Sequence, residues 1–567
     1  MIRRLLPGIM ALLFFSCSYN EPVNFWNARG TGSILYALSK NAGRGVLPLA
    51  TEGKLEYRLS GLRNAQNEYA LEISYSIQGG RENRSSIILE SGDFSWELPQ
   101  DFSFLNNPEL TAIAESSAGT ISYTVPLPYG LPEQINVICK PEDGKSAAKD
   151  ISFNIKSIGL AMPWYGFSFN RENNSVRLSP FVYSENNSIY IDLPSPFYIK
   201  GDLQIRNTGS GRFTAEGAGP GQQGYFRIEG ESRNGTFNIP AIFIAKTSYP
   251  VRISVTDVNT RTDADIRNIT GAGIYEVSSA AGMDPVTADP GMILSWPQDA
   301  FRDPRYEVFR WESFPSILIF DFADYDIQDR FLKRLAFYAE KAGFRGRLAA
   351  DREIAGLHGW NAHDYRAETL AAFYGLAEAE NFPLLPEELE LKKILLDAKI
   401  IVRNATGSLV PGEGAIISIS RESEEYLRAL FMAHEGYHGL YFIDQGFRDF
   451  CKQRWENLTQ VPRSFILSYF DYQAYDIKDQ DLVITEFMAH ILQQPVSQAE
   501  RYFGLTLAGR IDASSWRRTV LPEKDEASGT WPLLGTAFRL EAEAFSRYVN
   551  ERWGLAAGRV SRVTVRL

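Results

Sequence analysis

Between about Phe25 and Thr287, apolar and polar residues alternate at a period of two in short segments. Turn-forming stretches such as Gly79-Gly80 and 217–221 separate these segments, which include 69–77, 86–90, 121–125, 151–155, 188–193 and 251–255. Alternation places neighbouring side chains on opposite faces of a strand, and short strands at this spacing are typical of β-sandwiches. The length accommodates two such domains, which we expect at 18–158 and 159–300.

The pattern becomes helical near Trp311. The apolar run 316–322 predicts a buried strand, and 326–343 predicts a helix with Asp326 as N-cap and Gly343 just past its end. Helical periodicity recurs at 364–379, 386–398, 424–442, 482–492 and 536–551. We therefore expect a multidomain chain, in which an N-terminal all-β sandwich region precedes a mainly helical α+β domain at 301–567.

The first residues predict an export signal at 1–17. Arg3 and Arg4 precede an apolar run at 5–15, which is too short to span a bilayer as a permanent helix. Ser16-Cys17 then resembles the lipobox of bacterial lipoproteins, whose cysteine is acylated and becomes the mature N-terminus. This resemblance implies a lipoprotein anchored at Cys17 in the bacterial cell envelope, either periplasmic or at the cell surface. The alternative is an ordinary cleaved signal in which Cys17 has no role.

Composition narrows the classes of partner. The 567 residues are 44% hydrophobic and 13% aromatic, which is typical of a folded chain. A formal net charge of −11 without any Lys/Arg-rich run argues against a nucleic-acid partner. Besides Cys17, only Cys139 and Cys451 are present, so we expect neither a disulfide framework nor a cysteine zinc site.

The stretch His434-Glu435-Gly436-Tyr437-His438 carries the strongest chemical signal. All five histidines of the chain lie after residue 357, and these two are spaced i and i+4. On a helix this spacing projects both imidazoles from one face, so that they can bind the same Zn²⁺. Glu435 can then act as general base toward a water whose pKa the zinc lowers. The alternative is a pair of buried structural histidines.

This His-Glu-x-x-His stretch resembles the zincin metallopeptidases. In that superfamily the motif helix follows a strand that binds the extended substrate along its edge, and 414–420 fits that place. A substrate backbone could add to it as a further strand. The resemblance covers roughly residues 403–494.

A third protein ligand has two candidates. In gluzincins it is a glutamate on a later helix, which the resemblance assigns to Glu486, with His490 one turn on as a second-shell or substrate-facing group. The metzincin-like pattern would instead use Asp444. That pattern needs a glycine where this chain has Tyr441, so we prefer Glu486.

Weaker candidates surround the motif. His358 and His363 lie in a stretch rich in polar and aromatic residues, and either could stabilise an oxyanion, although a structural loop is an equal alternative. Five tyrosines flank the motif and could supply a phenol, and the sequence does not choose among them: 437, 441, 469, 472 and 475.

The sequence thus predicts an enzyme, a zinc metallopeptidase that hydrolyses protein or peptide substrates at the cell envelope. Two alternatives stay open. One is a surface-binding lipoprotein for a glycan or protein ligand, with an inactive or regulatory zincin domain. The other is a metal-dependent hydrolase of a different carbonyl substrate.

Overall fold

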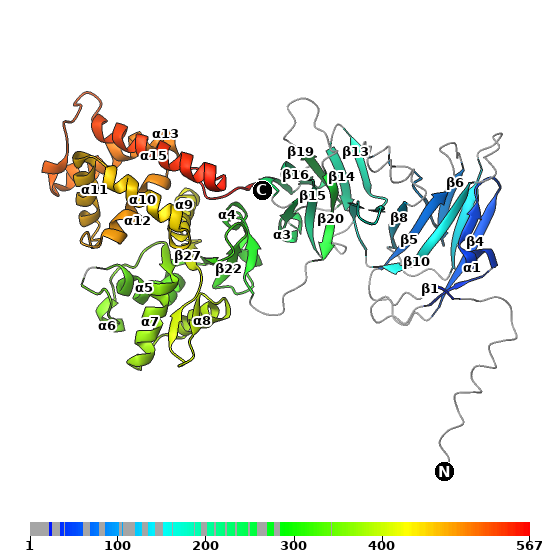
Figure 1. Cartoon of the computed structure of the whole chain (residues 1–567), viewed down its shortest axis with the longest axis horizontal. Helices are drawn as coiled ribbons and strands as arrows, with labels where there is room; N and C mark the ends of the chain where they lie inside the picture. Colours follow the sequence, from blue (N-terminus) through cyan, green and yellow to red (C-terminus); the bar gives the residue numbers. More distant parts are fainter. Residues whose placement is uncertain are drawn as a thin grey trace, which may run out of the picture. The chain divides into compact units, whose positions relative to one another are not determined.

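The computed structural model describes residues 284–341 and 343–567. Before these it describes 22–24, 34–38, 40–60, 69–78, 85–100, 102, 105, 119–127, 134–141, 151–161, 163–185, 188–193, 201–208, 211–220, 224–232, 235–245, 247, 250–257 and 269–276. The chain divides into two compact units, Met1–Ser278 with Arg566–Leu567, and Ser279–Val565. The first is rich in β-sheet and the second is mainly helical, as expected (Figure 1). The expected export signal at 1–17, with Cys17, lies outside the described residues.

The strands of the first unit belong to three sheets. Their orders are β1-β2-β4-β9-β6-β7, β18-β15-β20-β11-β12-β8-β5-β10-β3 and β13-β14-β19-β16-β17. The elements are β1 (Pro22–Asn24), β2 (Ile34–Ala37), α1 (Lys40–Arg44), β3 (Val46–Pro48), β4 (Gly53–Ser60), β5 (Tyr69–Gln78), β6 (Ser86–Ser91), β7 (Phe94–Glu97), β8 (Thr120–Leu127), β9 (Gln134–Lys140), β10 (Ser152–Ala161), β11 (Gly166–Asn170), β12 (Ser175–Leu178), β13 (Val182–Glu185), β14 (Ser188–Leu193), β15 (Gly201–Asn207), β16 (Arg212–Ala218), β17 (Tyr225–Glu231), β18 (Thr236–Ile239), α3 (Ala241–Ala245), β19 (Val251–Asp257) and β20 (Ile269–Glu276). The division between the two units falls within the C-terminal β28 (Thr564–Arg566).

The boundaries of this unit differ from those read in the sequence. Residue 159, where we expected one sandwich to end, lies inside β10, which pairs with β5 through Ala161. The nine-stranded sheet also joins strands from both sides of that position, since β8 pairs with β12 in parallel. The unit ends at Ser278 rather than at 300, because the residues that follow belong to the second unit.

A five-stranded sheet with the order β21-β22-β23-β27-β24 forms the centre of the second unit. Its strands are β21 (Val286–Ala288), β22 (Tyr306–Trp311), β23 (Ile317–Phe322), β24 (His363–Arg366) and β27 (Ala415–Ser420). β23 and β27 run parallel in the middle, and every residue of both is buried, which explains their continuous apolar runs. β24 pairs antiparallel with β27 and stands at the end of the sheet.

Alternate residues of the central strands face two different helical layers. Leu318, Phe320 and Ile416 join a core with α5 (Tyr325–Ala339), α7 (Ala367–Ala379) and α8 (Pro386–Asp397). Ile317 and Ile417 point the other way. They meet α9 (Glu425–Ile443) at Gly439, where an added Cβ would lie 3.1 Å from Ile317 and 3.5 Å from Ile417. The glycine therefore lets the helix that carries the histidine motif pack closely on the sheet.

A buried ion pair fixes α9 to this face. Asp321 follows the same alternation as Ile317, is fully buried, and accepts two hydrogen bonds from Arg428 on α9, at 2.9 and 3.1 Å. Arg421 also pairs with this carboxylate. Leaving either charge unpaired would cost about 3–5 kcal/mol, so the register of α9 on the sheet is strongly specified.

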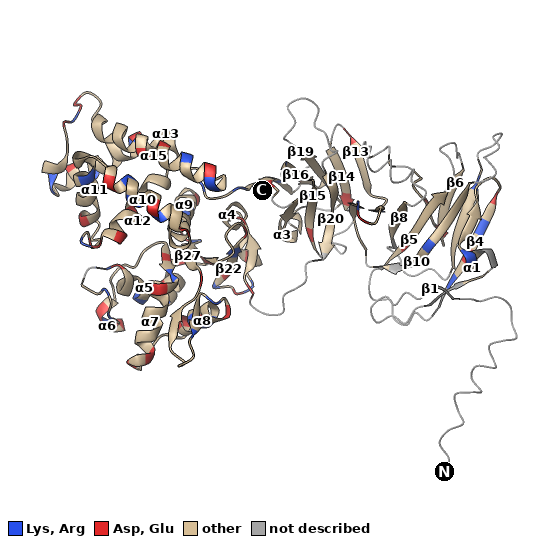
Figure 2. Cartoon of the chain, in the orientation of Figure 1, with Lys and Arg blue, Asp and Glu red and all other residues tan. Residues whose placement is uncertain are grey.

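The remaining helices pack beyond α9. α12 contacts α9, α10 and α15 (Figure 1). Acidic and basic residues are interspersed along these helices (Figure 2). The other elements of this unit are α4 (Pro290–Leu294), η5 (Gln298–Ala300), α6 (Asp351–Ile354), β25 (Ile401–Arg403), β26 (Leu409–Pro411), α10 (Gln445–Asn457), α11 (Gln460–Tyr472), α12 (Gln480–Leu492), α13 (Val496–Arg501), the π-helix η6 (Tyr502–Leu507), α14 (Ala508–Ser514), η7 (Arg518–Val520) and α15 (Pro532–Trp553).

Among the predicted helix starts that differ from the structure, those of α5 and α7 differ in capping and in strand pairing. α5 is capped by Asp324, whose side chain accepts from the Ile327 amide, and not by Asp326. The helix expected at 364–379 begins only at Ala367, because residues 363–366 pair with β27 as β24. This second difference changes the site, since it places Asp364 on a strand.

Candidate metal centre

Helix α9 brings His434 and His438 together, as the spacing predicts. Their Nε2 atoms lie 3.2 Å apart, and the rings are 4.8 Å apart between centroids. His438 is 1% exposed, and His434 lines a cavity. Burial, and then the neighbouring His434, holds the pKa of His438 well below its usual value, so this imidazole is neutral and has a lone pair to offer.

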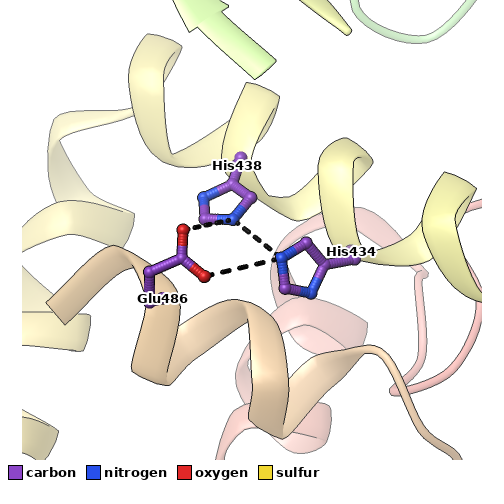
Figure 3. Close-up of side chains that lie close together, drawn as sticks. All are labelled: His434, His438 and Glu486. Carbon is purple, nitrogen blue, oxygen red and sulfur yellow. Dashed lines mark hydrogen bonds and ion pairs between the residues drawn. The ribbon is translucent and has the colours of Figure 1, made fainter. Parts of the chain in front are cut away.

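Helix α12 adds Glu486 to this pair. Its Oε2 lies 3.6 Å from Nε2 of His434 and its Oε1 lies 3.6 Å from Nε2 of His438, so the three side chains converge (Figure 3). Glu486 is 5% exposed, and its buried Oε2 has no hydrogen-bond partner among the described residues.

The donor set suits a tetrahedral metal ion. An ion that holds nitrogen and oxygen ligands at about 2.0–2.1 Å separates them by roughly 3.3 Å. The three separations in this site are 3.2, 3.6 and 3.6 Å. Without a cation, a buried carboxylate oxygen would lack a partner at a cost of about 1–3 kcal/mol. The residues therefore fit the ion that the sequence predicts, and Zn²⁺ is the common choice for two imidazoles and one carboxylate.

Hydrogen bonds to the other ring nitrogens orient both imidazoles. Nδ1 of His434 lies 2.9 Å from Oε1 of Gln493, and Nδ1 of His438 lies 2.9 Å from the hydroxyl of Thr485. The amide oxygen of Gln493 can only accept, so the proton of His434 sits on Nδ1. With the same tautomer at His438, both Nε2 lone pairs point toward Glu486.

Glu435 is 5% exposed and lines the cavity beside the histidines. It forms a side-chain hydrogen bond with Asp364, and both groups form a second close cluster with His438. Burial, followed by the charge of Asp364, raises the pKa of Glu435 well above its usual value. Burial and the charge of Glu486 raise the pKa of Asp364 to about 7. Two carboxyls in contact share a proton readily, so this pair can accept and release one.

A cavity of about 390 Å³ opens beside the cluster, and His434, Glu435 and Glu486 line it. Its residues include the apolar stripe of α9 and groups from α11, α12, the π-helix and α14. They are Glu340, His358, Trp360, Asn361, Ala362, Asp364, Leu427, Leu430, Phe431, His434, Glu435, Tyr469, Gln473, Tyr475, Glu486, His490, Gln493, Tyr502 and Arg510. The volume falls within the range of roughly 300–1,000 Å³ that is typical of ligand pockets.

The three other histidines have different surroundings. His490 lines the cavity, its ring lies 5.3 Å from that of His434, and its Nδ1 is within 3.1 Å of both Gln493 and the Tyr502 hydroxyl. Since both neighbours can donate to Nδ1, its Nε2 carries the proton and is a donor. His358 is exposed on the cavity wall. His363 is buried, does not line the cavity, and contacts the Ala362 carbonyl.

Asp444 stands apart from the metal candidates. It ends α9 and caps α10, where its side chain accepts from the Phe447 amide at 2.7 Å and pairs with Arg552 at 2.6 Å. The helix does continue past Tyr441, as the missing glycine suggests. Of the two candidates, only Glu486 lies with the histidines.

The strand at 414–420 does not have the place that we expected for it. β27 lies between β23 and β24, so it offers no free edge to a substrate. The edge strand is β24, which carries Asp364 into the cavity. The sequence does not reveal β24, because its four residues are too few for a visible alternation and join directly to helix α7.

Several residues of the site were not predicted from the sequence. Thr485 and Arg510 are common polar residues on helices, and Glu340 and Gln493 directly follow helices. Nothing in their spacing sets them apart. Asp364 lies in the same polar stretch as His358 and His363, which marks it as a candidate. The helix expected at 364–379 nevertheless does not predict its position on a strand.

Comparison of the chain with protein-family models and with curated proteins found no match. Among the described residues, no helix is long and apolar enough to cross a bilayer. Cys139 and Cys451 are free and buried.

Proposed function

We propose that the second unit is a zinc-dependent peptidase of the gluzincin type. The observation that carries the proposal is the convergence of two imidazoles and one carboxylate whose buried oxygen has no other partner. A zinc ion bound by them would lower the pKa of a water ligand and polarise a substrate carbonyl.

In this proposal Glu435 takes a proton from the attacking water and passes it to the leaving amine. Asp364, hydrogen-bonded to Glu435, holds its carboxyl in place. His490 and Tyr475 both line the cavity, and their N–H and O–H groups can donate to the oxyanion. A peptide backbone would pair with β24, the edge of the sheet, and rest its side chains on Leu427, Leu430 and Phe431.

The test is zinc content and peptide cleavage by the purified chain. We expect about one Zn²⁺ per chain and cleavage that a chelator abolishes. Glu435→Gln should keep its zinc and lose cleavage by at least about a hundredfold, since it lacks the base. Glu425→Gln, an exposed residue of the same helix, is the matched control. A zinc-loaded wild-type chain that cleaves no peptide in a diverse library would refute the proposal.

We also propose that the chain is exported and acylated at Cys17, on the strength of its first 17 residues. Metabolic labelling with a fatty acid in a bacterial host tests this. Label in the wild type and none in Cys17→Ser is expected, whereas an unlabelled wild-type chain would rule out the anchor.

A further inference from the structure

Acidic side chains outnumber basic ones in the lining of the cavity. Four carboxylates line it, from Glu340, Asp364, Glu435 and Glu486, and the single guanidinium is that of Arg510. Three of these carboxylates belong to the centre described above. Arg510 has no part in that chemistry, so its presence in the wall calls for a separate explanation.

Arg510 has no acidic partner among the residues that the structure describes from 343 onward. Its one hydrogen bond there goes to the Tyr469 hydroxyl, at 3.4 Å. The acids close to it in the chain have other partners: Asp512 pairs with Arg518 and Lys524, and Asp471 pairs with Arg517. The exposed side chain therefore keeps most of its five N–H donors for a ligand.

The backbone holds Arg510 on the wall that adjoins the metal centre. The π-helix Tyr502–Leu507 leads into α14, and such turns are frequent at functional sites. Gly504 lies so close to Gly535 of α15 that an added Cβ would be 2.9 Å from its Cα. This contact fixes the turn, and with it the direction in which α14 leaves.

Arg510 lies within reach of a short peptide bound at the metal centre. It bonds to Tyr469, whose ring is 5.7 Å from that of His490, and His490 is in turn 5.3 Å from His434. An extended chain advances about 3.3 Å per residue, so these contacts correspond to a few residues of substrate.

We propose that Arg510 binds a carboxylate of the substrate peptide, a few residues from the bond that is cleaved. This inference rests on the proposed peptidase function and names the substrate class: peptides that bear either a free C-terminal carboxylate or an Asp or Glu side chain at that distance. The planar guanidinium binds a carboxylate through two parallel hydrogen bonds, which gives both affinity and a fixed orientation.

The four cavity carboxylates do not exclude such a substrate. A divalent cation would compensate the charge of Glu486. Burial raises the pKa of Glu340 well above its usual value, which favours the uncharged form of its carboxyl. A substrate carboxylate near Arg510 would then meet less negative charge than four ionised carboxylates would give.

The experiment uses the full zinc-loaded chain and internally quenched peptides in matched pairs. One set differs in a free or an amidated C-terminus, and the other in Glu or Gln at successive positions after the scissile bond. We expect kcat/KM to favour the carboxylate member of one set by about ten- to a hundredfold, mainly through KM. Arg510→Gln should abolish the preference, and Arg510→Lys should keep part of it.

Arg547→Gln, an exposed arginine of α15 outside the cavity, is the matched control and should keep the preference. Whichever set shows the effect identifies the source of the carboxylate. A preference that persists in Arg510→Gln, or no preference in the wild type, overturns the inference while the peptidase function stands.

Peptide binding to the Glu435→Gln chain, measured by fluorescence anisotropy, provides a second readout that does not depend on turnover. There the carboxylate member should bind about tenfold more tightly or better, and adding Arg510→Gln should remove the difference. If wild-type chain cleaves nothing, the proposed function fails, and equal binding of both members would then reject the role of Arg510 as well.

Discussion

The hydroxyl of Thr485 should control how tightly the candidate centre binds zinc. It lies 2.9 Å from Nδ1 of His438 and, as the acceptor of that N–H, leaves Nε2 unprotonated for the metal. Thr485→Val has nearly the same shape and lacks the acceptor. The next acceptor, an oxygen of Asp364, is 3.8 Å from Nδ1, which is beyond hydrogen-bond range.

The magnitude follows from the tautomers of His438. A buried N–H without an acceptor costs about 1–3 kcal/mol. The metal-free chain can avoid this cost by moving the proton to Nε2, where Nε2 of His434 at 3.2 Å offers an acceptor. The metal-bound chain cannot, because its Nε2 is occupied by the ion. Zinc affinity should therefore fall by about ten- to a hundredfold, since each factor of ten corresponds to about 1.4 kcal/mol.

The assay is competition for Zn²⁺ between the metal-free protein and a chromophoric chelator of known affinity, at neutral pH. Thr485→Ser keeps the hydroxyl and should bind zinc nearly as the wild type does. Thr369→Val removes a half-buried hydroxyl on α7, outside the cavity, and controls for the loss of any helical threonine. A folded Thr485→Val chain whose Kd lies within twofold of the wild type would refute the tautomer argument.

Two further predictions concern the third ligand and His363. Glu486→Ala should lower zinc occupancy strongly, whereas Asp444→Ala, which removes a helix cap, should leave zinc occupancy unchanged. Metal analysis after dialysis measures the zinc occupancy of both variants. The reverse result would make Asp444 the third ligand in place of Glu486. Burial lowers the pKa of His363 to about 3, below its usual 6.5. The unfolded chain then binds more protons between these values, so the stability that neutral His363 contributes is complete above pH 6.5 and is lost as pH falls. From pH 7 to 5 the metal-free wild type should lose about 2 kcal/mol of unfolding free energy that His363→Gln keeps, in urea titrations; equal pH slopes would contradict the shift.

Local periodicity in the sequence is enough to predict single helices and strands. The spacing of His434 and His438 requires only that the segment be helical, because one turn brings the two imidazoles to the same face. Likewise, the alternation in β5 and β14 and the apolar runs of β23 and β27 depend on residues a few positions apart, and all four strands form where the pattern predicts them.

Local periodicity does not predict which elements far apart in the chain contact each other. Whether Glu486 or Asp444 lies near the histidines depends on how α10 and α11 return the chain to α9, which no periodicity encodes. The boundary expected near residue 159 differs from the structure for a related reason. Chain length suggests two sandwiches but does not place their boundary, and β10 extends through this position to Ala161. The sequence predicts a helix start in place of β24, because four residues give too little alternation to outweigh the helical pattern that follows.

The strand order nonetheless gives the proposed mechanism its geometry. In β24 the buried His363 and Tyr365 alternate with Asp364 and Arg366, so Asp364 projects from the opposite face to its neighbours. That face is the one on which α9 packs, and there Asp364 meets Glu435. The hydrogen bond between Asp364 and Glu435 therefore joins two parts of the proposed mechanism. Asp364 belongs to the sheet edge that can pair with a peptide backbone, and Glu435 is the carboxyl that can move a proton. A substrate added to β24 would run beside the candidate centre, and for this reason the edge strand, rather than the strand that precedes α9 in the chain, should set where a peptide is cut.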